Sequence, residues 1–429
     1  MDTSLEHIPA GTRKHAGRLR WTVCAMLFFA TSINYMDRQV LGILASTLQK
    51  SIGWTEQEYG YIISAFQIAY AIGLVTAGRL IDRIGTRIGY TVVMALWSIA
   101  SMAHAFATTA FGFGLARFFL GLGEAGNFPA AIKATAEWFP RDERSLATGI
   151  FNSGANLGAV LAPALIPIIT LRYGWQAAFL LTGFFGALWI VWWLVSYRAP
   201  ADHKRITRSE YEYIHEDGPS ELAAIPYRAL LSYRQTWAFA IAKFLTDPIW
   251  WFYLYWLPKF FDSHFHLGLS QLGLPLIVVY NVSAVGSIGG GWIPAFLHRR
   301  GFSMVQARYT AMFIAACLVL PIFFAARFTH EWLAVAVLSL AAAAHQGWSA
   351  NLYTIASDMF PREAIGAVVG IGGMAGSIGG VLFSLGVGYL LQVTHSYTVL
   401  FAISSSAYLV AFLWLRLTVP SLPKIQVPA

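Results

Sequence analysis

EWFPR, at residues 137–141, is followed by NSGANLG at 152–158, and both stretches recur in the second half of the chain. The second copies are DMFPR at 358–362 and GMAGSIG at 373–379, and both are displaced by the same offset, with no gap needed between them. Because this constant offset is roughly half the length of the chain, we infer that the chain consists of two similar halves. Both copies lie between long apolar segments, and membrane proteins of this kind typically carry their site where the halves meet. The repeat therefore predicts a pore or a transporter.

The composition places most of the chain in a membrane. Hydrophobic residues make up 57% and charged residues 12% of the sequence, against about 25% charged residues in an average soluble domain. Apolar stretches of about twenty residues recur along the chain, each long enough to cross a hydrocarbon layer of about 30 Å as a helix. The predicted fold is all-α and membrane-embedded, with twelve transmembrane helices in two pseudo-symmetric six-helix bundles. The twelve predicted spans are roughly 21–46, 58–80, 88–108, 110–134, 145–170, 176–197, 235–260, 270–296, 305–326, 331–356, 364–391 and 396–417.

One long polar stretch separates the first six spans from the last six. It contains the breaker pair Gly218-Pro219, and a short amphipathic helix is expected at Ser209–His215. We interpret this stretch as a linker between two bundles. The predicted boundaries are a cytoplasmic tail at 1–20, a six-helix bundle at 21–197, a cytoplasmic linker at 198–233, a six-helix bundle at 234–418 and a cytoplasmic tail at 419–429.

The basic residues are distributed unevenly over the predicted connections. The termini and the even-numbered connections hold 21 Lys and Arg residues, and the odd-numbered connections hold 4. Because positive residues accumulate on the cytoplasmic face, both termini and the linker are predicted to be cytoplasmic. The basic residues lie in short scattered turns, so we expect no nucleic-acid partner. Cys24 and Cys317 lie in apolar spans and are expected to be packed side chains rather than a disulfide or a metal pair.

GRLIDRIGTR, at 78–87, follows the second predicted span. Asp82 can cap a neighbouring helix end there and pair with Arg83 and Arg87 on the cytoplasmic face. Breaking these contacts would open that face, so we predict a gating role for the three residues. The corresponding turn after the eighth span, LHRRG at 297–301, contains no acid. The second gate is therefore expected to be weaker or to be built differently.

Four ionisable residues interrupt the apolar spans: Asp37, Arg38, Arg117 and Glu124. Such residues are costly in a membrane and are functional by default. Arg117 and Glu124 share one helix face, about 10 Å apart along the axis. One interpretation is a buried structural cluster, with Asp37 near Arg117 or Arg38 near Glu124. In the other, which we favour, Arg38 and Arg117 bind an anion through bidentate contacts. Asp37 and Glu124 then carry protons, because burial favours the neutral form of a carboxylic acid.

The second half offers further polar residues for a substrate. His345 is the repeat counterpart of Glu124, and Trp348, one turn on, presents a flat ring of the kind that stacks on sugars. A hydrogen-bonded histidine and a packed tryptophan are the structural alternatives. Lys243 and Asp247 are one turn apart and are expected to pair, while Lys133 can reach toward the cytoplasmic surface. The residues expected to bind substrate hydroxyl groups are Tyr70, Asn152, Asn156 and Ser377.

GLGEAG, at 121–126, matches the dinucleotide-binding pattern G-x-G-x-x-G. It lies inside an apolar span and no strand precedes it, so we reject a dinucleotide site. No candidate catalytic triad, metal cluster or phosphate loop is evident in the sequence. We therefore expect no enzyme activity and no cofactor, and a membrane sensor or enzyme is the less favoured class.

Taken together, the motifs resemble the major facilitator superfamily and, within it, the anion:cation symporter family, in particular bacterial hexuronate transporters. The stretches that carry the resemblance are GRLIDRIGTR at 78–87, NYMDR at 34–38, GLGEAGNFP at 121–129, EWFP at 137–140, TGIFNSG at 148–154, DPIWWFY at 247–253, HQGWSAN at 345–351 and GIGGMAG at 370–376. The resemblance implies proton coupling through Asp37 and Glu124 and substrate binding by Arg38, Arg117 and Tyr70. Ala155 stands where galactonate-type relatives carry a substrate-binding glutamine, which favours a uronate.

The resulting prediction is a monomeric proton-coupled importer of hexuronates, such as glucuronate or galacturonate. It would work by alternating access in the bacterial inner membrane, with a small anionic sugar acid, a proton and the lipid bilayer as its partners. Two alternatives stay open from the sequence. One is a proton symporter of another small organic anion, such as an aldonate or an aldarate. The other is an uncoupled sugar-acid facilitator, which would not need Asp37 and Glu124 in the membrane.

Overall fold

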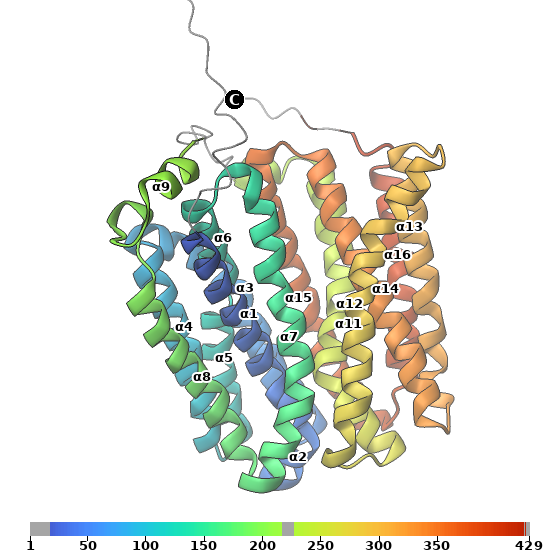
Figure 1. The fold of residues 1–429 in the computed structure, drawn as a ribbon. Coiled ribbons are helices and arrows are strands. Elements are labelled where there is room, and N and C mark those ends of the chain that lie inside the picture. The colour runs from blue at the N-terminus through green and yellow to red at the C-terminus, as the bar shows by residue number, and fades with distance from the viewer. Residues whose placement is uncertain (1–17, 217–226, 424, 426–429) are drawn as a thin grey trace, which may run out of the picture.

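The computed structural model describes residues 18–216, 227–423 and 425, and all of its regular elements in these ranges are helices. Long helices stand side by side in an upright bundle (Figure 1). The first half contains α1 (Leu19–Ile43), α2 (Ala45–Ile52), α3 (Glu56–Ile84), α4 (Thr86–Ala103), η2 (His104–Phe106), α5 (Ala110–Glu124), α6 (Asn127–Trp138), α7 (Arg141–Tyr173) and α8 (Trp175–Ser196). The connecting segment contains η3 (Pro200–Asp202), α9 (Arg208–Ile214) and α10 (Tyr227–Leu230). The second half contains α11 (Arg234–Phe265), α12 (Leu269–Arg299), α13 (Met304–Val319), η4 (Leu320–Arg327), α14 (Glu331–Met359), α15 (Arg362–Thr394) and α16 (Thr398–Thr418).

The sequence repeat marks equivalent helices in the two halves. α7 and α15 are both 33 residues long, and each starts directly after the proline of its repeat copy, Pro140 or Pro361. Each also packs closely on the first long helix of its half. A Cβ at Gly158 would lie 2.3 Å from the carbonyl oxygen of Ser32 in α1, and a Cβ at Gly379 would lie 2.3 Å from that of Phe244 in α11. The repeated glycine therefore preserves the same backbone contact in both halves.

The halves meet mainly through two pairs of helices, α3 with α15 and α7 with α12, and also through α11, which contacts α1 and α2. A glycine pair in α12, Gly286 and Gly290, packs on Ala343 and Gly347 of α14, within the second half. These glycines and Gly154 with Gly158 therefore allow tight packing inside each half. They do not form the surface between the halves.

Nine helices of the described ranges are long and apolar enough to cross a membrane. The three predicted spans outside this group correspond to α1, to α5 with α6, and to α11. α1 and α11 carry charged residues, which lower the mean hydropathy of a helix, while α5 and α6, of 15 and 12 residues, are each too short to span a membrane alone. When these three spans are counted together with the nine, the all-helical fold with twelve spans is confirmed.

The predicted single span at 110–134 is broken in the structure. α5 ends at Glu124 and α6 begins at Asn127, within a glycine-rich stretch. A Cβ at Gly121 would lie 2.4 Å from the carbonyl oxygen of Phe66, and a Cβ at Gly123 would lie 2.7 Å from the amide nitrogen of Trp97. The glycines thus bring α5 against α3 and α4, and the interruption leaves Glu124 at a helix end.

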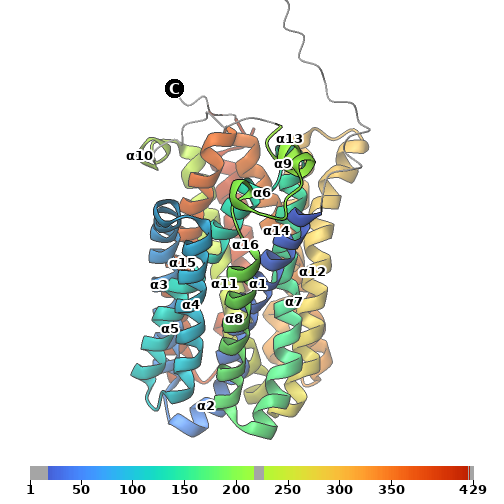
Figure 2. The ribbon, with the colours of Figure 1, turned by 60° about the vertical axis from the view of Figure 1, so that its left-hand side comes forward.

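The short helix expected in the linker is confirmed as α9, which lies at the opposite end of the bundle from α2 (Figures 1 and 2). α9 is attached to the first half by Arg20 of α1. The Arg20 guanidinium pairs with Glu143 of α7 at 2.8 Å and with Glu210 of α9 at 3.4 Å. Residues 1–17 of the predicted tail and the breaker pair Gly218-Pro219 lie outside the described residues.

Candidate functional site

Arg38 and Glu124 form a buried ion pair between α1 and α5. The Arg38 Nε and a terminal guanidinium nitrogen both lie 2.9 Å from Glu124 Oε2. Asn34, one turn earlier in α1, accepts from Arg38 at 3.3 Å and donates to the Glu124 backbone carbonyl at 3.4 Å. One of the two pairings considered from the sequence is therefore present. A salt bridge at this depth is costly unless its geometry is good and its remaining groups are satisfied.

Aromatic rings from both halves surround the Arg38 guanidinium. Its central carbon lies 4.9 Å from the ring centroids of Tyr35 and Tyr70 and 5.2 Å from that of Trp251 in α11. Aromatic faces attract a guanidinium electrostatically. Tyr70, predicted to bind substrate, therefore does lie at the arginine. Trp251 was not among the residues predicted to bind substrate.

Arg117 lies beside this pair and carries unused hydrogen-bond donors. One terminal nitrogen donates to the Arg38 backbone carbonyl at 3.2 Å. Its Nε and its other terminal nitrogen are buried and have no protein partner among the described residues. The ring of Tyr255 in α11 lies 5.6 Å from its guanidinium carbon. Buried donors are normally satisfied, so these two groups are suited to an anion that brings its own acceptors.

Asp37 points to a different surface of α1 from that of Arg38. Its Oδ1 accepts a hydrogen bond of 2.8 Å from Ser101 of α4, and the Ser101 hydroxyl lies 3.2 Å from that of Thr182 in α8. Asp37 Oδ2 is buried without a partner in the described part of the chain. The two acids predicted to carry protons thus occupy separate environments. Glu124 pairs with an arginine, whereas Asp37 lies at a pair of hydrogen-bonded hydroxyl groups.

His345 and Trp348 lie inside the second half rather than at Arg38. The His345 Nδ1 is 2.6 Å from the Tyr408 hydroxyl, and its ring stacks on Trp250 with centroids 5.1 Å apart. Trp348 is fully buried, with its ring edge-on to Tyr408 at 5.6 Å. These contacts are those expected of packing, so contact between Trp348 and a substrate stays a prediction that needs the site to rearrange.

The remaining predicted residues are divided between surface and interior. Asn152 and Asn156 of α7 are exposed, whereas Ser377 is buried and donates to the Gly373 carbonyl at 3.0 Å. Lys243 and Asp247 pair as expected, at 2.7 Å. Cys24 is buried and Cys317 is half-buried, and both are free cysteines.

The predicted contacts of the gating motif are partly wrong. Asp82 pairs with Lys133 of α6 at 2.8 Å instead of with Arg83 or Arg87, and Lys133 also donates to the Ile81 carbonyl at 3.2 Å, in the last turn of α3. Arg87 donates to the backbone carbonyl of Leu194 in α8 at 2.5 Å. In the second half, Arg308 pairs with Asp358, which joins α13 to α14. Arg308 is the repeat counterpart of Arg87, so the second half has its own ion pair here, built differently as expected.

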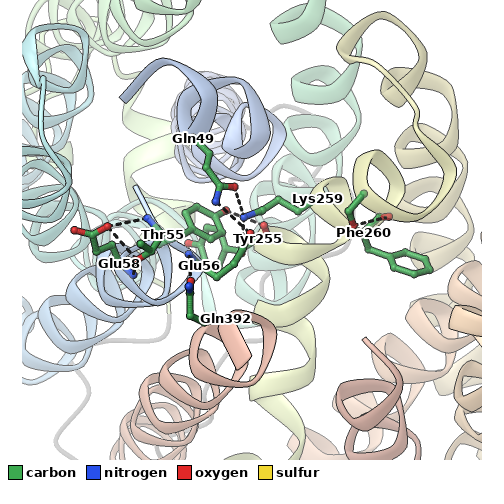
Figure 3. Close-up of polar contacts among 10 residues, drawn as sticks. Gln49, Thr55, Glu56, Glu58, Tyr255, Lys259, Phe260 and Gln392 are labelled. Carbon is green, nitrogen blue, oxygen red and sulfur yellow. Dashed lines mark hydrogen bonds and ion pairs between the residues drawn. The ribbon is translucent and has the colours of Figure 1, made fainter. Parts of the chain in front are cut away.

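A second polar cluster, which we call the α2-end closure, joins the halves at the end of the bundle that carries α2 (Figure 3). It consists of Gln49, Glu56, Lys259 and Gln392. The Lys259 ammonium of α11 lies 2.5 Å from Glu56 Oε2 and 2.7 Å from Gln49 Oε1. The Glu56 backbone amide donates to Gln392 of α15 at 3.1 Å. The partners lie up to 336 residues apart in sequence, so no local pattern indicated this cluster.

Further hydrogen bonds between the halves continue inward from the α2-end closure. The Tyr59 hydroxyl donates to the Tyr255 carbonyl at 2.8 Å, and Ser384 donates to Gln67 at 3.2 Å. A polar cavity of about 340 Å³ lies beside the closure, lined by residues that include Glu56 and Lys259. A cavity of about 410 Å³ between α1, α7 and α8 has an almost wholly apolar lining and lacks the charged residues of the candidate site.

The protein is a membrane-spanning helical bundle of two similar halves, and aromatic rings from both halves contact its buried charges. These features define a multi-pass membrane transporter. The chain belongs to the Major Facilitator Superfamily, whose family model matches residues 27–384. It is therefore a transporter and not an enzyme.

Two characterised relatives transport sugar acids. The chain is 31% identical to the hexuronate transporter of Escherichia coli (strain K12), over 95% of this chain and 96% of the relative. It is 32% identical to the galacturonate transporter of Dickeya chrysanthemi, over 76% of this chain and 96% of the relative. The crystal structure of a D-xylose-proton symporter superposes with a TM-score of 0.76 at 14% identity, over 94% of this chain and 99% of that chain. That likeness supports the fold alone.

Proposed function

We propose that the protein is a proton-coupled symporter of hexuronates in the bacterial inner membrane. The observation that carries the proposal is the buried Arg38, which holds Glu124 as its carboxylate partner and is contacted by rings from both halves. A guanidinium in this position suits a substrate carboxylate. The similarity to transporters of hexuronate and of galacturonate supports a uronate as the anion.

The Arg38–Glu124 pair gives a physical reason for coupling. When the carboxylate of an incoming anion takes Arg38, Glu124 loses its partner. A buried unpaired carboxylate costs several kcal/mol, and uptake of a proton removes that cost. Anion and proton therefore bind together, and the charge inside the membrane stays balanced. The unused donors of Arg117 provide a second contact for the anion.

Asp37 is proposed as a second proton carrier. Its hydrogen bond from Ser101 does not involve Arg38, so its protonation does not compete directly with the substrate. Among the described residues, no partner stabilises a negative charge on Asp37 Oδ2, so the charged form of Asp37 gains little at this depth. Tyr70, Asn152, His345 and Trp348 remain the proposed sugar contacts.

Transport is proposed to occur by alternating access. The α2-end closure joins the halves at one end, and the positive-residue bias assigns that end to the outside. Opening toward the outside then requires Lys259 to leave Glu56 and Gln49. Asp82, Arg83 and Arg87 are proposed to act at the cytoplasmic end, and the predicted domain boundaries, cytoplasmic termini and monomeric state belong to the same proposal.

The proposal is tested by uptake into proteoliposomes with an imposed pH gradient. Radiolabelled glucuronate and galacturonate are compared with an aldonate and an aldarate. We expect accumulation of a uronate above its external concentration, and collapse of accumulation when a protonophore is added. Preferred uptake of the aldonate or the aldarate would favour the alternative anion symporter. Equilibration without accumulation would favour a facilitator.

A further inference from the structure

Lys243, Asp247 and Tyr353 form a polar group in the second half that the coupling mechanism does not use. The Lys243 ammonium lies 2.7 Å from Asp247 Oδ2 and donates to the Tyr353 hydroxyl at 3.1 Å. It also lies 4.6 Å from the centroid of the Tyr353 ring. Charged residues inside a membrane span are costly and indicate a functional site. We call this group of three residues the hydroxyl-end site.

Two residues of the hydroxyl-end site lie on the same helix, α11, as Trp251. Trp251 contacts the Arg38 guanidinium at 5.2 Å. Asp247 and Lys243 precede Trp251 by one and two turns, which displaces them along the helix by about 6 and 12 Å. A six-carbon acid anchored on Arg38 can therefore extend toward this group.

The three residues differ in their solvent exposure. The Lys243 side chain is 6% exposed and that of Asp247 is 19% exposed, while Tyr353 is 39% exposed. The Tyr353 oxygen accepts from Lys243, so its own O–H remains free to donate. The accessible groups are therefore a carboxylate acceptor and a phenol donor, and the ammonium is neutralised behind them.

Asp247 is held in this position by α15. A Cβ at Gly376 would lie 2.3 Å from Asp247 Oδ2, so the glycine leaves room for the carboxylate and no more. An acceptor and a donor side by side match the hydroxyl groups of a sugar. A second carboxylate on the ligand would instead meet the charge of Asp247 with no unpaired cation to bind it.

We propose that the hydroxyl-end site binds the uncharged end of the substrate, and that Asp247 excludes dicarboxylates by keeping Lys243 neutralised. This inference rests on the proposed function and refines it. The substrate would carry one carboxylate, on Arg38, and a hydroxyl-bearing end at Asp247 and Tyr353. Asp247 is then a specificity-determining residue that selects a uronate over the corresponding aldarate.

The test compares glucuronate, whose carbon 1 is the hemiacetal of a sugar ring, with glucarate, an open chain whose carbon 1 is a second carboxylate; the change in their affinity ratio between variants cancels this difference in ring form. Binding of each is measured by calorimetry on the purified full-length protein and on Asp247→Asn, which frees Lys243 to pair with the second carboxylate. We expect the affinity for glucarate relative to glucuronate to rise at least tenfold. Asp358→Asn is the matched control, because it removes the acid of another ion pair in the same half, and its ratio should stay at the wild-type value.

An unchanged ratio in a folded Asp247→Asn protein would overturn the inference, as would wild-type protein that prefers glucarate. If Asp247→Asn does not fold, the double variant Lys243→Met/Asp247→Leu replaces the pair by apolar side chains. A purely structural pair predicts wild-type glucuronate affinity in this variant, and that result would also overturn the inference. The hydroxyl-end site predicts at least a tenfold loss. Wild-type protein that binds neither acid would refute the proposed function, and this inference with it.

Discussion

Lys259→Met is expected to open the α2 end of the transporter. Lys259 donates to Glu56 at 2.5 Å and to Gln49 at 2.7 Å, and both partners belong to the other half. A hydrogen bond to a charged group contributes about 1.5–3 kcal/mol. Loss of a single such bond would therefore shift the closed-to-open ratio about tenfold, and loss of both about a hundredfold. Glu56, left without its cation, would add to the shift.

Distances between spin labels at Lys50 and His395 can measure this opening. Both residues are exposed beside the α2-end closure, Lys50 in α2 and His395 directly after α15. Cys24 and Cys317, which are free, are first replaced by serine. We expect the label pair to show a longer distance in the Lys259→Met protein than in the otherwise unchanged protein.

The control is the double variant Lys259→Met/Glu56→Leu. Replacing a buried ion pair by apolar residues of similar size is often neutral, so this variant should recover much of the closed population. Identical distance distributions in the wild type and in Lys259→Met would refute the reasoning. Equal opening in the single and double variants would show that the unpaired Glu56 charge contributes nothing.

Four further variants test the site. Arg38→Lys and Arg117→Lys should each weaken uronate binding at least tenfold, about 1.4 kcal/mol, because an ammonium lacks the bidentate fork; calorimetry giving wild-type affinity for both would contradict anion binding by these residues. Glu124→Gln should abolish accumulation under a pH gradient yet retain binding and counterflow, and persistent uphill uptake in proteoliposomes would show that Glu124 is structural. Trp348→Ala should weaken uronate binding if Trp348 contacts the sugar, and it should also lower the thermal unfolding temperature, since truncating a fully buried tryptophan costs about 3–5 kcal/mol; a destabilised protein with wild-type uronate affinity would assign Trp348 to packing alone.

The sequence predicted the fold well because the decisive features are local or periodic. The span length and the half-chain repeat can both be read along the chain. The break between Glu124 and Asn127 was missed, since hydropathy is blind to a short interruption in an apolar stretch. The break is seen only in the backbone of the folded chain, where α5 ends and α6 begins.

The site was predicted in part for a related reason. Arg38, Arg117, Asp37 and Glu124 stand out because charges are rare in apolar spans, but their pairing depends on how α1 and α5 pack. Both arrangements considered from the sequence were compatible with the spacing, and the structure has Arg38 on Glu124. Partners from the other half cannot be found this way. Trp251 and Lys259 come from α11; nothing local distinguishes Trp251 from a residue that lines lipid, and nothing local shows that Lys259 pairs with Glu56 of the other half.

The arrangement of α11 links the site to the α2-end closure. Trp251, Tyr255 and Lys259 follow one another at four-residue spacing, so they form a continuous stripe on one side of the helix. Trp251 contacts Arg38, Tyr255 contacts Arg117, and Lys259 binds Glu56. When an anion replaces Glu124 at Arg38, the rings of Trp251 and Tyr255 must adjust to a new neighbour, and they share a rigid helix with Lys259. We therefore expect substrate binding and closure at the α2 end to be coupled through α11, without a separate element to carry the signal.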